Sequence, residues 1–292
     1  MNILHLPSAG LSGLLVLLLS APPLPAAGLW GRLQVKISGG IITSGDGDIA
    51  GIIRGMEDYH RDLATMWGKT KTGALDWPRE GWALGGEVEM ALTRRVGLCL
   101  SLDSFLKNKD ASLRLTPDPW MAVTGHCRVS AAFLSLSGVY RFPLDESAQV
   151  FLKGGPSFAW MGNEVEYRLE SGNGWWEEKT AGIRDAAFGL QAGAGVEYRI
   201  SKTLSLTAEG LWRWTKFSSW TGEYDRVNSD GRTDHISGPV WLEEVMWQTG
   251  KYYPEAVIGN KDVPHPTRTV RAFQVGFSGL VFKVGLKVAL GR

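Results

Sequence analysis

The sequence predicts an all-β protein: an eight-stranded antiparallel β-barrel that crosses a membrane, with long loops that carry one or two short helices. Three observations predict this fold. In eight segments, apolar and polar residues alternate with a period of two, as they do in strands. The apolar face of these segments carries no charged residue. The connections between the segments are alternately short and long, which is typical of membrane barrels.

Composition excludes several classes of protein. The chain has 292 residues, of which 31 are basic and 30 acidic, and its net charge is +1. Nucleic-acid binding requires a clustered basic surface, so we expect no nucleic-acid partner. A hydrophobic content of 44% is too high for a disordered chain. The sequence shows no phosphate-binding glycine loop, zinc-ligand spacing or nucleophile elbow, so we expect neither a metal nor another cofactor.

Residues 1–27 are expected to be a secretory signal peptide, and residues 28–292 the barrel domain. The first segment contains no Lys, Arg, Asp or Glu, has an apolar stretch at Leu11–Leu19, and ends in two alanines that suit a cleavage site. A transmembrane helix is the alternative, but three prolines interrupt the segment before it reaches about 20 residues. Export is therefore the favoured interpretation.

The barrel strands follow directly from the alternation. It is clearest in Ala186–Ile200, where apolar residues and small or polar residues occupy opposite faces. The eight predicted strands are Leu33–Ile41, Trp82–Leu92, Val96–Leu106, Val129–Phe142, Gln149–Trp160, Ala186–Ile200, Leu204–Trp214 and Leu280–Leu290. The charged residues all lie on the polar face: Lys36, Glu87, Glu89, Asp103, Arg141, Lys153, Glu197, Arg199, Glu209, Arg213, Lys283 and Lys287.

The connections fix the orientation. Short connections are expected at Thr93–Arg95, Pro143–Ala148 and Ser201–Thr203, and long ones at roughly 44–81, 107–128, 161–185 and 215–279. In outer-membrane barrels the short turns are periplasmic and the long loops extracellular.

Alternation alone does not decide which face points outward, because a soluble barrel would turn its apolar face inward around a ligand. Three features favour the membrane. The polar face is rich in Gly, Ala and Ser, which a narrow lumen requires. Aromatic residues gather at both ends of the strands, as in the girdles of membrane barrels. Four long loops at one end are also unusual for a soluble barrel.

Two short stretches strengthen this interpretation. Residues 191–198 read Gln-Ala-Gly-Ala-Gly-Val-Glu-Tyr, and the first strand runs from Ile-Ser-Gly-Gly at 37–40 to Gly-Asp-Gly-Asp at 45–48. Over residues 30–292 the chain resembles the outer-membrane β-barrel domain family, whose simplest members are eight-stranded barrels like that of outer membrane protein A. The resemblance implies an integral, multi-pass protein of a Gram-negative outer membrane. It also implies contact with outer-membrane lipid and insertion by the barrel-assembly machinery.

The lumen offers the first candidate site. Lys36, Glu87, Glu209 and Lys283 come from four neighbouring strands at comparable heights. Charges inside a narrow barrel must pair, since burying an isolated charge costs several kcal/mol. The resulting network is either static packing or, as the family resemblance suggests, a gate. A diffusion pore is not expected, because an eight-stranded barrel is just wide enough for side chains to fill it.

The long loops offer the second candidate site, since they contain eight of the thirteen tryptophans. These rings either form a binding surface for an unknown extracellular ligand, as tryptophans often do, or are buried where the loops pack together. The residues proposed for binding are Trp67, Trp120, Trp175, Trp176, Trp241 and Trp247.

Two short helices are expected in these loops. Apolar residues at helical spacing between Asp48 and Gly68 predict an amphipathic helix over the barrel mouth, with Asp48 as its N-cap and Gly68 at its end. A second helix is expected after Pro239, over Trp241–Trp247.

The predicted role is non-enzymatic: structural, or surface binding through the tryptophan-rich loops. The alternatives are a small-solute channel or a surface hydrolase. A protease would use an Asp–His pair, for which Asp234 with His235 and Asp58 with His60 are candidates. A lipid hydrolase would need a Ser–His pair, and the sequence offers only His126 and Ser130, with nothing to single them out.

Cys99 and Cys127 are expected to stay unbonded. The strand register of their hairpin places Cys99 near Ser135, about eight residues along the strand from Cys127, whereas a disulfide requires Cα atoms within about 7 Å.

Overall fold

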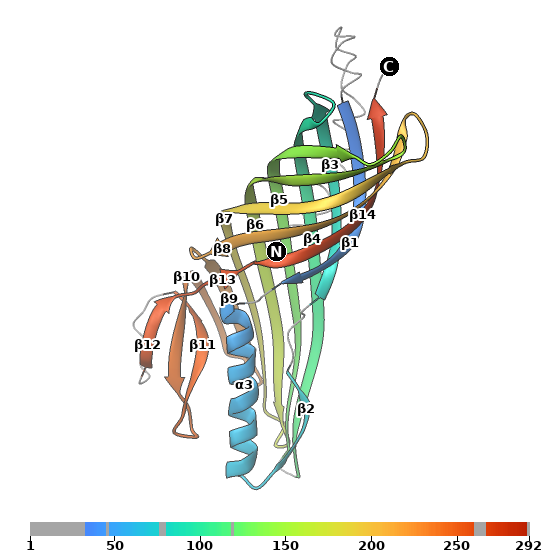
Figure 1. The fold of residues 1–292 in the computed structure, drawn as a ribbon. Helices are drawn as coiled ribbons and strands as arrows, with labels where there is room; N and C mark the ends of the chain where they lie inside the picture. The colour runs from blue at the N-terminus through green and yellow to red at the C-terminus, as the bar shows by residue number, and fades with distance from the viewer. Residues whose placement is uncertain (1–32, 45–46, 76–79, 118–119, 260–266, 291–292) are drawn as a thin grey trace.

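The computed structural model describes residues 33–44, 47–75, 80–117, 120–259 and 267–290. Eight antiparallel strands close into a barrel, which confirms the predicted fold class (Figure 1). In barrel order they are β1 (Leu33–Ser44), β3 (Glu80–Ala91), β4 (Val96–Thr116), β5 (Met121–Pro143), β6 (Ala148–Ser171), β7 (Trp176–Arg199), β8 (Leu204–Phe217) and β14 (Gly279–Leu290). Pairing of β14 with β1 completes the ring. The expected signal peptide lies outside the described residues.

The strands are staggered around the barrel. A single row of register partners runs through Leu106, Trp82, Ile41, Phe282, Gly210, Ala194, Leu152, Tyr140 and Val96. The row leaves β4 at Leu106 and returns to the same strand at Val96, ten residues lower. A closed barrel with this stagger has strongly tilted strands. Residues at different distances from the ends of their own strands therefore lie at the same level along the barrel axis and meet in the lumen.

The apolar face points outward. Leu84, Leu190 and Phe282 are each about half exposed, whereas Lys36 and Arg213 on the other face are buried. A soluble barrel would show the opposite arrangement. The outer surface of the barrel is therefore apolar, as a membrane barrel requires, and the polar residues line the lumen.

At one end the strands are joined by short turns at 92–95, 144–147 and 200–203. At the other end the expected loops at 107–128 and 161–185 prove to be mostly strand. There β4 pairs with β5, and β6 with β7, in ladders that continue beyond the barrel as two long hairpins. The prediction of loops was wrong because neighbouring strands continue to pair with each other outside the membrane, where no bilayer imposes a regular alternation of apolar and polar residues. Only residues 117–120 and 172–175 connect these strands.

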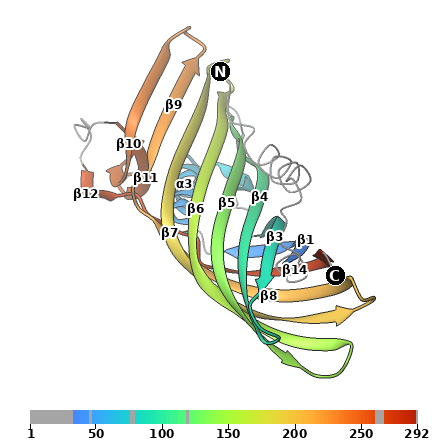
Figure 2. The ribbon, with the colours of Figure 1, turned by 90° about the horizontal axis from the view of Figure 1, so that it is seen from above.

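Further strands extend the sheet outside the barrel, and Figure 2 shows β9 and β10 continuing its curve beyond β7. They are β2 (Thr70–Ala74), β9 (Thr221–Asn228), β10 (Thr233–Met246), β11 (Tyr252–Ile258), β12 (Thr267–Ala272) and β13 (Val275–Gly276). The second expected helix is contradicted, since Trp241–Met246 belongs to β10. This segment pairs with β11 on one side and with β12 on the other, and this pairing determines its conformation.

The first expected helix is confirmed as α3 (Gly47–Met66). Asp48 is not the predicted N-cap, because it lies within the first turn of the helix. Its carboxylate instead accepts hydrogen bonds from the Gln274 backbone N–H and from Arg271, both at 2.7 Å, which tie the start of the helix to the segment around β12 and β13. Gly68 follows the helix with φ of +63°, a left-handed conformation that suits glycine. The helix runs away from the barrel beside β11 and β2 rather than across the mouth (Figure 1). Among the described residues, no helix has the length and apolarity needed to cross a membrane.

We call α3, β2, β9–β13 and the extended parts of β4–β7 the outer body. It packs around two apolar cores. The first is shared with the mouth of the barrel and joins Ile49 of α3 to Phe105 and Phe277, and the second lies farther out, where Leu63 packs with Leu113. The long connections are therefore a folded extension of the barrel sheet around one helix.

Cys99 and Cys127 are both buried and form no disulfide, as expected. Cys99 pairs in register with Ser137, two residues from the predicted partner, and Cys127 pairs with Lys109. We expect alkylation in denaturant without reductant to modify two thiols per chain, measured by intact mass. A chain with no modified thiol and both sulfurs in one bridge would contradict this register of β4 and β5.

Candidate functional site

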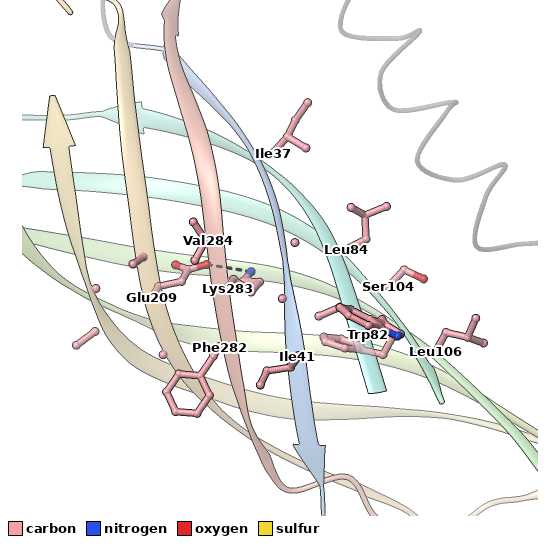
Figure 3. A pocket seen from close by; sticks show the side chains of 18 of the residues that line it. Ile37, Ile41, Trp82, Leu84, Ser104, Leu106, Glu209, Phe282, Lys283 and Val284 are labelled. Atoms are coloured by element: carbon pink, nitrogen blue, oxygen red, sulfur yellow. Dashed lines mark ion pairs between the residues drawn. The ribbon is translucent and has the colours of Figure 1, made fainter. Parts of the chain in front are cut away.

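The four predicted lumen residues come together. Lys36 Nζ lies 2.9 Å from both a Glu87 and a Glu209 carboxylate oxygen. Lys283 Nζ lies 3.0 Å from Glu209 and 3.3 Å from Glu87. Figure 3 shows the Glu209–Lys283 pair, which joins β8 to β14. All four charged side chains are buried, so each depends on the others for compensation.

Three further charged residues complete this layer. Lys153 Nζ on β6 lies 2.7 Å from Glu87, and Asp103 on β4 accepts from Lys283 Nζ at 2.9 Å. Arg213 on β8 pairs with Asp103, and its guanidinium lies 4.8 Å from the ring centres of Phe105 and Phe133. The charge pattern marked these residues as lumen-facing, but only the ten-residue stagger brings them to the height of Glu87.

A second charged layer lies closer to the short turns. Lys287 Nζ is 2.9 Å from Glu89 and 2.8 Å from Glu197, and Arg141 also pairs with Glu89. These four side chains are buried too. The lumen is thus crossed by two successive sets of ion pairs that link opposite walls.

Small residues make room for these pairs. A Cβ on Gly85 would clash with Asp103 Oδ1, and one on Gly97 would lie 2.7 Å from Glu89 Oε1. The glycines of the polar face therefore reflect a crowded lumen, as the sequence indicated.

The hollow in Figure 3 lies against the barrel wall and is lined largely by outward-facing residues. Ile41, Trp82 and Val284 are 49%, 75% and 57% exposed. In a membrane this surface contacts lipid chains, so we do not assign it to a soluble ligand.

The predicted tryptophans do not form one surface. Trp67 and Trp247 are exposed, whereas Trp120, Trp175, Trp176 and Trp241 are half-buried. Another loop tryptophan, Trp220, is fully buried in the inner core of the outer body. Packing between the segments that were predicted as loops therefore accounts for part of the tryptophan content. Trp77 lies outside the described residues.

Three of these tryptophans do gather, at the tips of the two long hairpins. The Gly172 N–H donates to the Trp120 carbonyl oxygen at 2.8 Å, which joins the tip that holds Trp175 and Trp176 to its neighbour. The Arg114 guanidinium lies 5.0 Å from the Trp120 ring centre, and that of Arg168 lies 5.1 Å from a Trp176 ring centre. Trp247 instead packs on Tyr59 of α3, with ring centres 5.1 Å apart.

The candidate protease acids are held in ion pairs. Asp234 pairs with Arg226, and Asp58 with Arg61. His235 Nδ1 lies 2.7 Å from Asp225 Oδ1, and this carboxylate raises the pKa of His235 through their hydrogen bond. His235 is thus oriented by a residue that the sequence did not single out, because β9 and β10 were not predicted.

The other two candidate histidines, His60 and His126, are held by different partners. His60 is buried on α3 with Nδ1 2.7 Å from the Met56 carbonyl oxygen, and burial lowers its pKa. His126 Nδ1 lies 2.6 Å from Asp110 Oδ1. Ser130 is four residues from His126 along β5, or about 13 Å at strand spacing, so the two form no catalytic pair. Within the described part of the chain, no group of three or more His, Cys, Asp or Glu is placed to hold a metal.

Comparison with known proteins supports the fold. A family model described as outer membrane protein beta-barrel domain matches residues 12–236. No curated protein matches the chain.

Several solved structures are similar over most of their length. Neisserial surface protein A is 10% identical, with a TM-score of 0.34, over 90% of this chain and 99% of its own. A major outer membrane protein of Thermus thermophilus is 13% identical, with a TM-score of 0.41, over 88% and 98%. The outer membrane protease OmpT of Escherichia coli is 10% identical, with a TM-score of 0.27, over 89% and 97%. The family match, which spans most of the chain, and the closed barrel show that this protein belongs to the outer membrane protein beta-barrel domain family and is integral to the outer membrane.

Proposed function

We propose that this protein is a closed, non-enzymatic outer-membrane barrel whose outer body has a structural or surface-binding role on the cell exterior. The ion pairs that cross the lumen carry the proposal. Glu87 is bound by lysines from three other strands, β1, β6 and β14, so the side chains of opposite walls are tied together in the middle of the barrel. A lumen occupied in this way favours a rigid support for the outer body over a path for solutes.

Conductance tests the closed lumen. In planar bilayers we expect the purified protein to give no steady ion conductance, and liposomes that contain it should not swell in small sugars. A diffusion porin from the same preparation serves as the positive control. Steady single-channel currents from the wild-type protein would contradict the proposal and favour the small-solute channel.

Hydrolysis assays test the non-enzymatic role. We expect no cleavage of peptide or phospholipid substrates that depends on His126 or His235. Activity that is lost in His126→Ala or His235→Ala, with the barrel still folded, would instead favour a surface hydrolase. The ion pairs of both histidines with exposed acids fit ordinary surface pairs, each of small energetic weight.

The hairpin tips supply the proposed binding surface. Tryptophan and arginine are enriched among the residues that dominate binding energy, and both types are stacked here within two neighbouring hairpins. We expect cells that display a variant with Ala at Trp120, Trp175 and Trp176 to adhere less than wild type to a panel of glycan-coated and protein-coated surfaces. Equal adhesion across the panel would contradict binding through these tips.

A further inference from the structure

We infer that the lumen binds a small monovalent anion of the chloride type beside Arg213, at a row of hydroxyl groups inside the barrel wall. The row consists of register partners on five neighbouring strands, β4 to β8, which lie on the lumen face: Ser101, Ser135, Ser157, Gly189 and Thr215. The hairpin tips take no part in this site, which lies within the closed lumen.

The central charged layer carries an excess of positive charge. Among the described residues it contains four cations and three acids, all of them buried: Lys36, Lys153, Lys283 and Arg213, and Glu87, Asp103 and Glu209. The layer closer to the turns is balanced, because its ion pairs join two cations to two acids: Arg141 and Lys287, and Glu89 and Glu197. A charge without compensation is costly to bury, so the central layer requires one further negative charge.

Arg213 supplies a donor without a partner. Its Nε donates to Gln191 Oε1 at 3.2 Å and its Nη2 pairs with Asp103, whereas Nη1 is buried and has no hydrogen-bond partner in the described chain. The backbone of Arg213 lies one row from the hydroxyl row, on the turn side. Asp103 and Phe133, which its guanidinium contacts, are partners in the next row on the loop side. The Arg213 side chain therefore crosses the hydroxyl row.

The hydroxyl groups of this row also lack partners. Ser101, Ser135 and Thr215 are each 1% exposed and Ser157 is 3% exposed. None of their four hydroxyl oxygens has a hydrogen-bond partner among the described residues. Thr215 Oγ1 lies over Gly189, where a Cβ would clash with it, so the absence of a side chain at this position leaves room for the hydroxyl. Each hydroxyl can donate one hydrogen bond to an anion.

An anion compensates this arrangement better than water does. Water can form hydrogen bonds with the hydroxyls, but it leaves the excess charge of the layer in place. A monovalent anion adds the one missing negative charge and accepts hydrogen bonds from the hydroxyls and from Arg213. The anion must be small, because side chains crowd the lumen around it.

Thermal unfolding of the full-length, detergent-solubilised barrel at constant ionic strength tests the inference, with chloride replacing gluconate, which is too large for the crowded lumen. We expect Tm to rise with chloride and then to saturate, as it does for a ligand that binds only the folded state. Ser135→Ala should raise the chloride concentration at half-saturation about tenfold or more, because a hydrogen bond to an ion is lost. Ser130→Ala is the matched control, since Ser130 lies five residues away on β5 and therefore on the other face. It should leave the half-saturation concentration unchanged.

Arg213→Gln removes the excess charge while Lys283 still pairs with Asp103, so it should abolish the dependence of Tm on chloride. A chloride dependence that is the same in Ser135→Ala and the wild type would overturn the inference, because the anion would then bind elsewhere. A wild-type Tm that is insensitive to chloride would overturn it too, and a Tm that instead rises at alkaline pH would identify a deprotonated lysine as the source of compensation. Should Arg213→Gln fail to fold, wild-type crystals soaked in bromide decide the question. An anomalous peak beside Arg213 Nη1 supports the inference, and diffraction without such a peak overturns it.

Discussion

Glu87→Ala is expected to lower the free energy of unfolding by about 3–5 kcal/mol, because it leaves buried charges without their partner. Glu87 lies 2.7 Å from Lys153, 2.9 Å from Lys36 and 3.3 Å from Lys283. After the substitution, Asp103 and Glu209 alone would face these three ammonium groups and Arg213. The side chains of this layer are buried and closely packed, so water cannot solvate the excess positive charge cheaply.

This loss is measured by unfolding the protein reversibly in urea in the presence of lipid vesicles. The folded fraction at each urea concentration is read from heat-modifiable gel migration. Glu178→Ala is the control, because Glu178 is exposed and lies 3.6 Å from Arg168, a contact worth at most about 1 kcal/mol. Adding Lys153→Ala to Glu87→Ala should recover part of the loss, since it removes one of the uncompensated charges. Strictly additive effects would show that Glu87 and Lys153 do not interact in the folded barrel.

The barrel could be predicted because two different environments act on each strand. Lipid excludes charge from one face of the strand, and a narrow lumen requires small or paired polar groups on the other. Apolar and polar residues therefore alternate with a period of two in every spanning strand. The same pattern shows that Lys153, Asp103 and Arg213 face inward. It does not give their heights, because the stagger between strands is a property of closure and does not appear in any single segment.

The outer body was harder to predict because it lies outside the bilayer, so its strands need not carry apolar residues on one face and polar residues on the other. In β4 the alternation continues through Leu113 and Leu115, but short polar runs interrupt it, so the extension looks like a loop. Trp241–Trp247 contains apolar and acidic residues that fit either a helix or a strand, and pairing with β11 and β12 decides between them. The helix at Gly47–Met66 was recognisable because its apolar stripe spans several turns and is followed by a terminating glycine.

Leu190→Arg tests the membrane placement of the outer face. Leu190 lies within the barrel part of β7 between Pro156 of β6 and Trp214 of β8, and it is 54% exposed to the outside. An arginine near the bilayer midplane costs about 2–4 kcal/mol, whereas one near the interface costs about 0–1 kcal/mol. We therefore expect Leu190→Arg to lower the free energy of unfolding in vesicles by about 2–4 kcal/mol.

Two variants separate this lipid effect from other causes. Leu144→Arg changes an exposed leucine in a short turn, outside the hydrocarbon, and should cost about 0–1 kcal/mol. Gln191→Arg lies one residue from Leu190 but faces the lumen, where Gln191 donates to Ser137 Oγ at 2.9 Å and accepts from Arg213 at 3.2 Å. The cost of Gln191→Arg arises from crowding and added positive charge in the lumen, so it should be the same in detergent micelles as in vesicles. The cost of Leu190→Arg should be smaller in micelles, because their apolar layer is thinner and more deformable than a bilayer. If Leu190→Arg and Leu144→Arg unfold with the same free energy in vesicles, the outer face of β7 does not lie in the hydrocarbon layer.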